Sequence, residues 1–210
     1  MRSTLCFGII GLIILSCNSS KTEINEKSNR FTKAELLEDI DYLKEYLVKG
    51  HPGLYWHSSE AEFETAIMEI ESSIGSDMTE LEFLRCVAKL NNIIKCVHSD
   101  IRPSSSFDSF WRGSVSLIPL NIAKVGSEYI IHQNMSESDD ITYGTKILSI
   151  NGKPIEEIVS HLLPYIPADG NNKTRKYYSL RRGFYRYYSY YWDCVSKSFT
   201  IGFETANGEL

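Results

Sequence analysis

Apolar residues recur every three or four positions along the first half of the chain, and three such runs predict three amphipathic helices. Each run starts at a Ser or Thr that is followed three residues later by Glu, the pattern of a capping box. The three pairs are Thr32 with Glu35, Ser59 with Glu62, and Thr79 with Glu82. No run is apolar on all sides, so each helix should bury one stripe against the others. The pattern predicts a three-helix bundle over residues 31–103.

The periodicity changes after Pro103 to short runs rich in β-branched residues, which predict strands. The serine-rich segment 104–109 is expected to be a loop, and the strands to cover residues 115–122, 128–132 and 146–150. Asn151-Gly152 predicts a tight turn, and Pro154 opens a predicted helix that runs to about residue 163. Residues 104–165 are therefore expected to form a small β-rich domain.

Aromatic residues dominate the segment from residue 177 to residue 192. Their helical spacing predicts a helix that packs aromatic side chains at a domain interface, with Phe184, Tyr187, Tyr188 and Tyr191 on one face. A surface that stacks on peptides or sugars is the alternative. Residues 198–205 predict a strand, and Asn207-Gly208 predicts a hairpin turn that only two residues follow. We expect residues 166–210 to hold this helix and a truncated hairpin, in a fold of the α+β class.

The first sixteen residues have the pattern of a signal peptide. Arg2 precedes an apolar run from Leu5 to Leu15, which is shorter than the roughly 20 residues that span a bilayer. A small residue directly before Cys17 resembles the lipobox of bacterial lipoproteins, which implies cleavage after residue 16 and a lipid on Cys17. An ordinary secretory signal is the alternative. Residues 17–30 are polar and are expected to form a flexible tether.

Charge and cysteine content narrow the classes of function. The chain has 22 basic and 27 acidic residues, which argues against a nucleic-acid partner and against a polybasic membrane surface. Membrane attachment would then depend on the lipid. Cys86, Cys96 and Cys194 follow Cys17, and the first two lie roughly 15 Å apart on one predicted helix, beyond disulfide reach. Buried free thiols are expected, with a pairing to Cys194 left open.

Two histidine features are the candidates for chemistry. His51 and His57 flank Pro-Gly-Leu-Tyr-Trp, and with no third ligand close in the sequence an aromatic-capped turn is preferred over a zinc site. No metal or other cofactor is expected. His98 follows the third predicted helix and precedes Ser99. A histidine placed there can act as a general base that a second group holds, the alternative being an exposed or capping histidine.

The order of these features resembles the front half of tail-specific, or C-terminal processing, serine peptidases, in the branch similar to the tricorn core. The resemblance rests on the turn at 51–55 (HPGLY), on His98-Ser99, and on residues 144–154 (GTKILSINGKP), which resemble the signature of a PDZ-like domain. It implies that the domain at 104–165 holds peptide ends by strand addition. It also implies that His98 is the general base, with Ser99 an orienting hydroxyl. The family usually has a small residue and an aspartate where this chain has Val97 and Cys96.

The resemblance implies an exported serine-type endopeptidase, anchored by lipid to the bacterial cell envelope at the outer membrane or the periplasmic face. Its partners would be polypeptide substrates or protein C-terminal tails. In this family the nucleophilic serine comes from a later α/β domain, and no candidate follows Leu210. We therefore expect the chain to be an amino-terminal, substrate-presenting region that is inactive alone. The alternatives are a non-catalytic envelope lipoprotein that binds peptide ends and a purely structural one.

Overall fold

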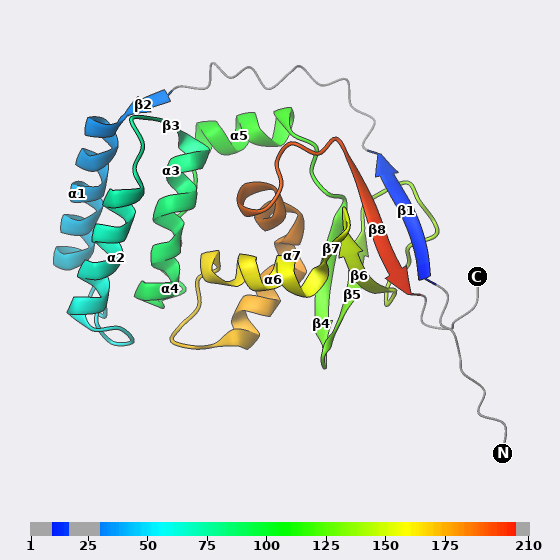
Figure 1. Cartoon of the computed structure of the whole chain (residues 1–210). Helices are drawn as coiled ribbons and strands as arrows, with labels where there is room; N and C mark the ends of the chain where they lie inside the picture. Colours follow the sequence, from blue (N-terminus) through cyan, green and yellow to red (C-terminus); the bar gives the residue numbers. More distant parts are fainter. Residues whose placement is uncertain (1–9, 17–29, 205–210) are drawn as a thin grey trace. The chain divides into compact units, whose positions relative to one another are not determined.

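The computed structural model describes residues 10–16 and 30–204, and these residues form two compact units. The helical unit holds residues 30–114 and 163–176, and the sheet unit holds residues 10–16, 115–162 and 177–204. Helices occur together with two antiparallel sheets (Figure 1). The predicted α+β class is confirmed.

The helical unit is built on three helices that begin where the sequence predicts. α1 (Lys33–Gly50), α2 (Glu60–Ser73) and α3 (Glu80–Val87) each follow a complete capping box. The third predicted helix is interrupted, because a 3₁₀ turn η1 (Ala88–Leu90) separates α3 from α4 (Asn91–Ile94). The buried face of each helix contributes to one core, which includes Leu36, Ile40, Leu47, Phe63, Ile67, Ile70, Val87, Leu90 and Ile94.

Two further elements complete this unit. Strands β2 (Arg30–Thr32) and β3 (Asp77–Thr79) pair antiparallel, and α5 (Ser105–Ser114) occupies the serine-rich segment. The prediction of a loop there was wrong. The Ser104 hydroxyl accepts a 3.2 Å hydrogen bond from the Phe107 N–H and so caps the helix. The rings of Phe107 and Trp111 stack at 5.4 Å and are buried, so the helix has an apolar face that serine content conceals.

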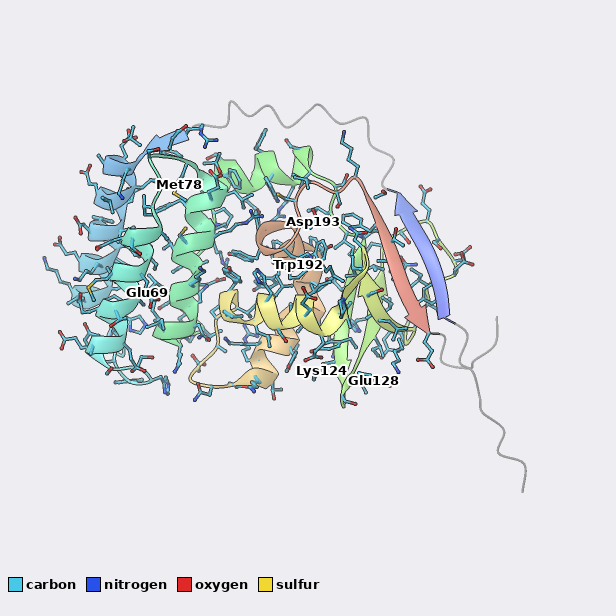
Figure 2. The ribbon with its side chains drawn as sticks, in the orientation of Figure 1. Glu69, Met78, Lys124, Glu128, Trp192 and Asp193 are labelled. Carbon is cyan, nitrogen blue, oxygen red and sulfur yellow. The ribbon has the colours of Figure 1, made fainter. Side chains whose placement is uncertain are left out.

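The sheet unit contains an antiparallel sheet with the strand order β1-β8-β6-β5-β4, and β7 pairs with β6. The bounds are β1 Ile10–Ser16, β4 Leu120–Val125, β5 Glu128–Asn134, β6 Lys146–Ile150, β7 Lys153–Pro154 and β8 Ser198–Glu204. Lys124 and Glu128 flank the turn between β4 and β5 (Figure 2). The strand predicted at 115–122 instead begins at Leu120. Pro119 before it has no N–H to donate to a ladder, and Val115 and Ile118 are buried without joining the sheet.

The predicted Asn151-Gly152 turn is confirmed, and it is attached to a third strand. Both residues have positive φ, 50° and 75°, as a tight hairpin turn requires. The Asn151 Oδ1 accepts from the Thr200 N–H at 2.8 Å, and the Asn151 N–H donates to the Thr200 carbonyl at 2.8 Å. The turn between β6 and β7 is therefore fixed to β8.

Two helices complete the sheet unit. α6 (Ile155–Leu162) follows β7, and a 3₁₀ turn η2 (Leu163–Tyr165) continues the chain. The predicted aromatic helix is confirmed as α7 (Lys173–Tyr191), with a non-helical backbone at Gly183. Within the sheet unit, Phe184 and Tyr188 are completely buried, and the Tyr188 ring meets Phe199 of β8 edge-on at 5.9 Å. These aromatic side chains form core.

Several predictions concern the ends of the chain. The last seven residues of the predicted signal peptide form β1, which does not test cleavage, so the signal peptide stays a prediction. Cys17, the tether up to residue 29, and the Asn207-Gly208 turn lie outside the described residues. In the part of the chain that the structure describes, no helix is both long and apolar enough to cross a membrane.

Candidate functional site

A cavity of about 710 Å³ in the helical unit brings both histidine features together. His51, His57 and His98 all line its wall, as do Asp100 and Asp169. His98 and Asp169 are exposed. The cavity is therefore the part of this unit where titratable side chains gather beside open space, which is the usual character of a ligand site.

The backbone at the end of α4 directs His98 toward this cavity. Lys95 ends the helix in the left-handed conformation, with φ 50°. The chain leaves the helix axis there, so Cys96 lies beyond the helix and not on it as predicted. The Lys95 carbonyl accepts from the Gly170 N–H at 2.9 Å, and the Lys95 Nζ donates to the His57 carbonyl at 3.1 Å. The loop after α4 is thus held by two other segments.

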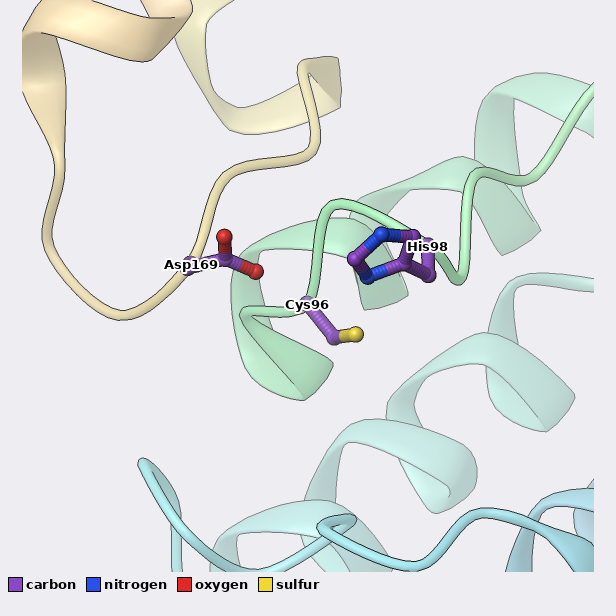
Figure 3. A group of neighbouring side chains, drawn as sticks. All are labelled: Cys96, His98 and Asp169. Atoms are coloured by element: carbon purple, nitrogen blue, oxygen red, sulfur yellow. The ribbon is translucent and has the colours of Figure 1, made fainter.

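Asp169 comes from a distant segment and lies beside this loop. The Val97 N–H donates to the Asp169 Oδ1 at 2.9 Å. The side-chain donor atoms of Cys96, His98 and Asp169 all lie within 4.8 Å of one another, and Figure 3 shows the three side chains meeting from two segments. The fold places a thiol, an imidazole and a carboxylate together, Cys96 half-buried and the other two exposed.

Ser99 also lines the cavity, although its hydroxyl does not contact the imidazole. Its backbone N–H donates to the Cys96 carbonyl at 3.2 Å, and among the described residues no hydrogen bond joins its Oγ to His98. The orienting role of Ser99 stays a prediction. The group beside the imidazole that sequence reasoning missed is Asp169, whose only signal is an Asp-Gly turn pair that gives no indication of which loop it meets.

The turn between α1 and α2 forms another part of the wall. The His51 Nδ1 accepts from the Gly53 N–H at 3.2 Å, and a Cβ at Gly53 would lie 2.7 Å from the Trp56 ring. This is the aromatic-capped turn that the sequence predicts. The His57 ring packs in the same way on Gly170, where a Cβ would lie 3.2 Å from the ring. The turn therefore packs against the segment that carries Asp169.

Aromatic side chains line the cavity where it meets solvent. Tyr46 is 66% exposed and Trp56 is 78% exposed, and both contribute to the cavity wall. Large aromatic side chains that stay this exposed can contact apolar groups of a ligand. The site therefore combines an apolar contact surface with the imidazole of His98.

The solved structures that this chain resembles are those of CPAF. Mature CPAF matches it with a TM-score of 0.52 and 12% identity, covering 71% of this chain and 28% of CPAF. Mature CPAF complexed with lactacystin gives the same values. CPAF is a chlamydial serine protease of the tail-specific-protease-like kind. No family model and no curated protein matches the sequence.

This likeness establishes a relationship of fold. At 12% identity it shows that the chain has a fold related to that of a serine protease, and the chain spans 28% of the CPAF structure it matches. It agrees with the predicted resemblance to tail-specific peptidases. It does not support the tricorn-core-like branch, and the PDZ-like domain stays a prediction.

Proposed function

We propose that this chain is the amino-terminal, substrate-binding region of a serine-type peptidase, and that His98 supplies the general base. One observation carries the proposal. His98 lies exposed on a cavity of about 710 Å³, in a chain whose fold is related to that of a serine protease. The predicted base and the largest described ligand site of the helical unit thus coincide.

The chemistry of the site suits this role. A histidine base takes the proton from a serine hydroxyl as the oxygen attacks the substrate carbonyl, and then gives that proton to the leaving amine. A carboxylate beside the ring orients it and stabilises the imidazolium. Asp169 has the position for this task, because its carboxylate lies within 4.8 Å of the His98 ring nitrogen and is fixed by the Val97 N–H.

The remaining parts of the proposal follow from the family resemblance. The nucleophilic serine would come from a later domain, so the 210-residue chain alone is expected to be inactive. Its substrates would be polypeptides or protein tails, with Tyr46 and Trp56 contacting their apolar side chains. Export and a lipid on Cys17 would place the protein on the cell envelope.

The test uses the protein with its downstream sequence and an unstructured peptide substrate. His98→Gln is expected to lower kcat by about 100-fold or more, the usual contribution of a general base, while KM changes little. His132→Gln, which alters a histidine of the sheet unit, is the control and should keep the kcat of the wild type. Unchanged cleavage by the His98 variant would overturn the base assignment. Peptide binding without cleavage by either protein would favour the non-catalytic binding lipoprotein.

A further inference from the structure

We propose that Cys96, His98 and Asp169 form a binding site for a Zn²⁺ ion. Thiolate sulfur, imidazole nitrogen and carboxylate oxygen are the three donor types that bind zinc in proteins. Each of these residues contributes one donor atom. Three protein ligands and a water molecule would complete a tetrahedral site with one open position.

The distances between the donor atoms are close to those that zinc requires. Zinc binds sulfur at about 2.3 Å and nitrogen or oxygen at about 2.0–2.2 Å, so donors around one ion lie roughly 3.3–3.7 Å apart. The three donor atoms here lie within 4.8 Å of one another. Side-chain rotations of about 1 Å would close the difference, and the exposed side chains of His98 and Asp169 have room to make them.

The backbone around the cluster is already organised. Cys96 and His98 lie on one loop and Asp169 on another, and two hydrogen bonds join the loops. These are the 2.9 Å bonds from Val97 N–H to Asp169 Oδ1 and from Gly170 N–H to Lys95 O. Outer partners of this kind orient metal ligands. Within the described residues no hydrogen bond involves the Asp169 Oδ2, the Cys96 Sγ or the His98 ring, so these donors are free for a metal.

Charge and ligand chemistry select zinc among the divalent cations. A thiolate and a carboxylate carry two negative charges, which the ion would neutralise. A sulfur donor favours zinc over magnesium or calcium, which take oxygen ligands. Asp100 lies in the same cavity, but its carboxylate bonds the Arg102 guanidinium at 2.6 Å, so it is not counted as a ligand.

A cysteine nucleophile is the other chemistry that these side chains suggest. A thiolate nucleophile needs a hydrogen bond to its base, and among the described residues none joins Cys96 to His98. The arrangement, with three donors surrounding one point, favours a metal. Zinc on the His98 ring would also occupy the nitrogen that the proposed base uses, so the metal would hold a peptidase inactive. That consequence rests on the proposed function, whereas the metal site does not.

The test is a Co²⁺ titration of the 210-residue chain, followed by displacement with Zn²⁺. Co²⁺ reports a sulfur ligand through a thiolate-to-metal charge-transfer band, so the wild type should show the band and lose it when Zn²⁺ is added. Cys96→Ser should abolish it. His98→Gln and Asp169→Asn should each weaken Zn²⁺ binding by more than about 100-fold, because even an outer partner is worth about 10–100-fold.

Matched controls are available in the same unit. Cys86→Ser removes another thiol and Asp100→Asn another carboxylate of the cavity, and both should keep the band and the affinity of the wild type. Circular dichroism of each variant confirms that it folds. The proposal is overturned if the wild type shows no band, or if the band persists in Cys96→Ser. Because no substrate is involved, a failed peptidase assay leaves this result unaffected.

Discussion

The backbone N–H of Val97 donates a 2.9 Å hydrogen bond to the Oδ1 of Asp169, which lies 72 positions later in the chain. This bond sits between Cys96 and His98 in the sequence and fixes the carboxylate beside both. It is an N–H to carboxylate bond, which is stronger than one between neutral groups. The geometry of the candidate site therefore depends on the loop that follows η2 as much as on the loop that follows α4.

Replacing Asp169 should release the Val97 amide. In Asp169→Ala the acceptor is lost, and we expect hydrogen exchange of the Val97 N–H to accelerate by about 10-fold, equivalent to ~1.4 kcal/mol. Asp169→Asn keeps an acceptor oxygen and should show a smaller change. Amide exchange measured by NMR gives both values. The Ser99 N–H, bonded to the Cys96 carbonyl, is the internal reference, and equal acceleration at both amides would contradict the assignment.

Tyr188→Phe should stabilise the protein. The Tyr188 side chain is completely buried, and its hydroxyl has no hydrogen-bond partner among the described residues. Burial raises the pKa of this hydroxyl, and the negative charge of Asp193 raises it further. A buried hydroxyl without a partner costs about 1–3 kcal/mol, so its removal should raise the free energy of unfolding by ~1 kcal/mol in urea denaturation.

The matched control is a tyrosine with a partner. The Tyr129 hydroxyl accepts from the Lys124 Nζ at 3.1 Å, so Tyr129→Phe should lower the free energy of unfolding by ~1 kcal/mol. The two Tyr→Phe changes remove the same atom and should act in opposite directions. Destabilisation by both would mean that the Tyr188 hydroxyl has a partner.

Stability should fall as the pH drops below about 6.5, the pKa of an unfolded histidine. Burial lowers the pKa of His132 in the folded protein, and the Arg181 guanidinium lowers it further. The Arg181 Nε donates to the His132 Nε2 at 3.0 Å, which needs a neutral ring. Between the two pKa values the unfolded state binds more protons, so the free energy of unfolding increases with pH. It is complete above pH ~6.5 and declines below it.

Urea unfolding measured between about pH 5 and about pH 7.5 tests this relationship. His132→Gln should reduce the dependence of stability on pH. Arg181→Met should reduce it less, because burial is the larger cause of the lowered pKa. A His132 variant with the pH dependence of the wild type would refute the explanation.

Asn151→Ala should destabilise the sheet unit by ~2 kcal/mol. The change removes the acceptor of the Thr200 N–H and places an alanine at a φ of 50°, each costing about 1 kcal/mol. Asn151→Gly tolerates the positive φ, so it isolates the hydrogen-bond contribution and should cost ~1 kcal/mol. Thermal or urea unfolding separates the variants, and equal losses would mean that backbone conformation contributes nothing.

Local patterns explain why much of the fold is predictable. A capping box depends on two residues three positions apart, and all three boxes, beginning at Thr32, Ser59 and Thr79, form as predicted. The Asn151-Gly152 turn likewise depends on the backbone preference of two residues. The strands at 128–132 and 146–150 and the aromatic helix follow from composition over a few residues. Each of these features contains its own cause.

Features that depend on distant contacts were not predictable. α5 forms because Phe107 and Trp111 find a core, and its serines alone suggest a loop. Cys96 leaves the helix because Lys95 adopts a left-handed conformation, which a lysine rarely does and no local residue announces. Asp169 reaches His98 only through the packing of its segment on α4. The base candidate was therefore visible in the sequence, whereas its carboxylate neighbour was not.

The pairing of β1 with β8 gives maturation of the amino terminus a structural meaning. β1 lies along one edge of β8 over seven residues, from Ile10 opposite Glu204 to Ser16 opposite Ser198. Cleavage before Cys17 would remove this strand and leave the backbone donors and acceptors on that edge of β8 unpaired. An open antiparallel edge is a template for an extended peptide. The leader would then act as an intramolecular occupant, and its loss would make room for a polypeptide from outside.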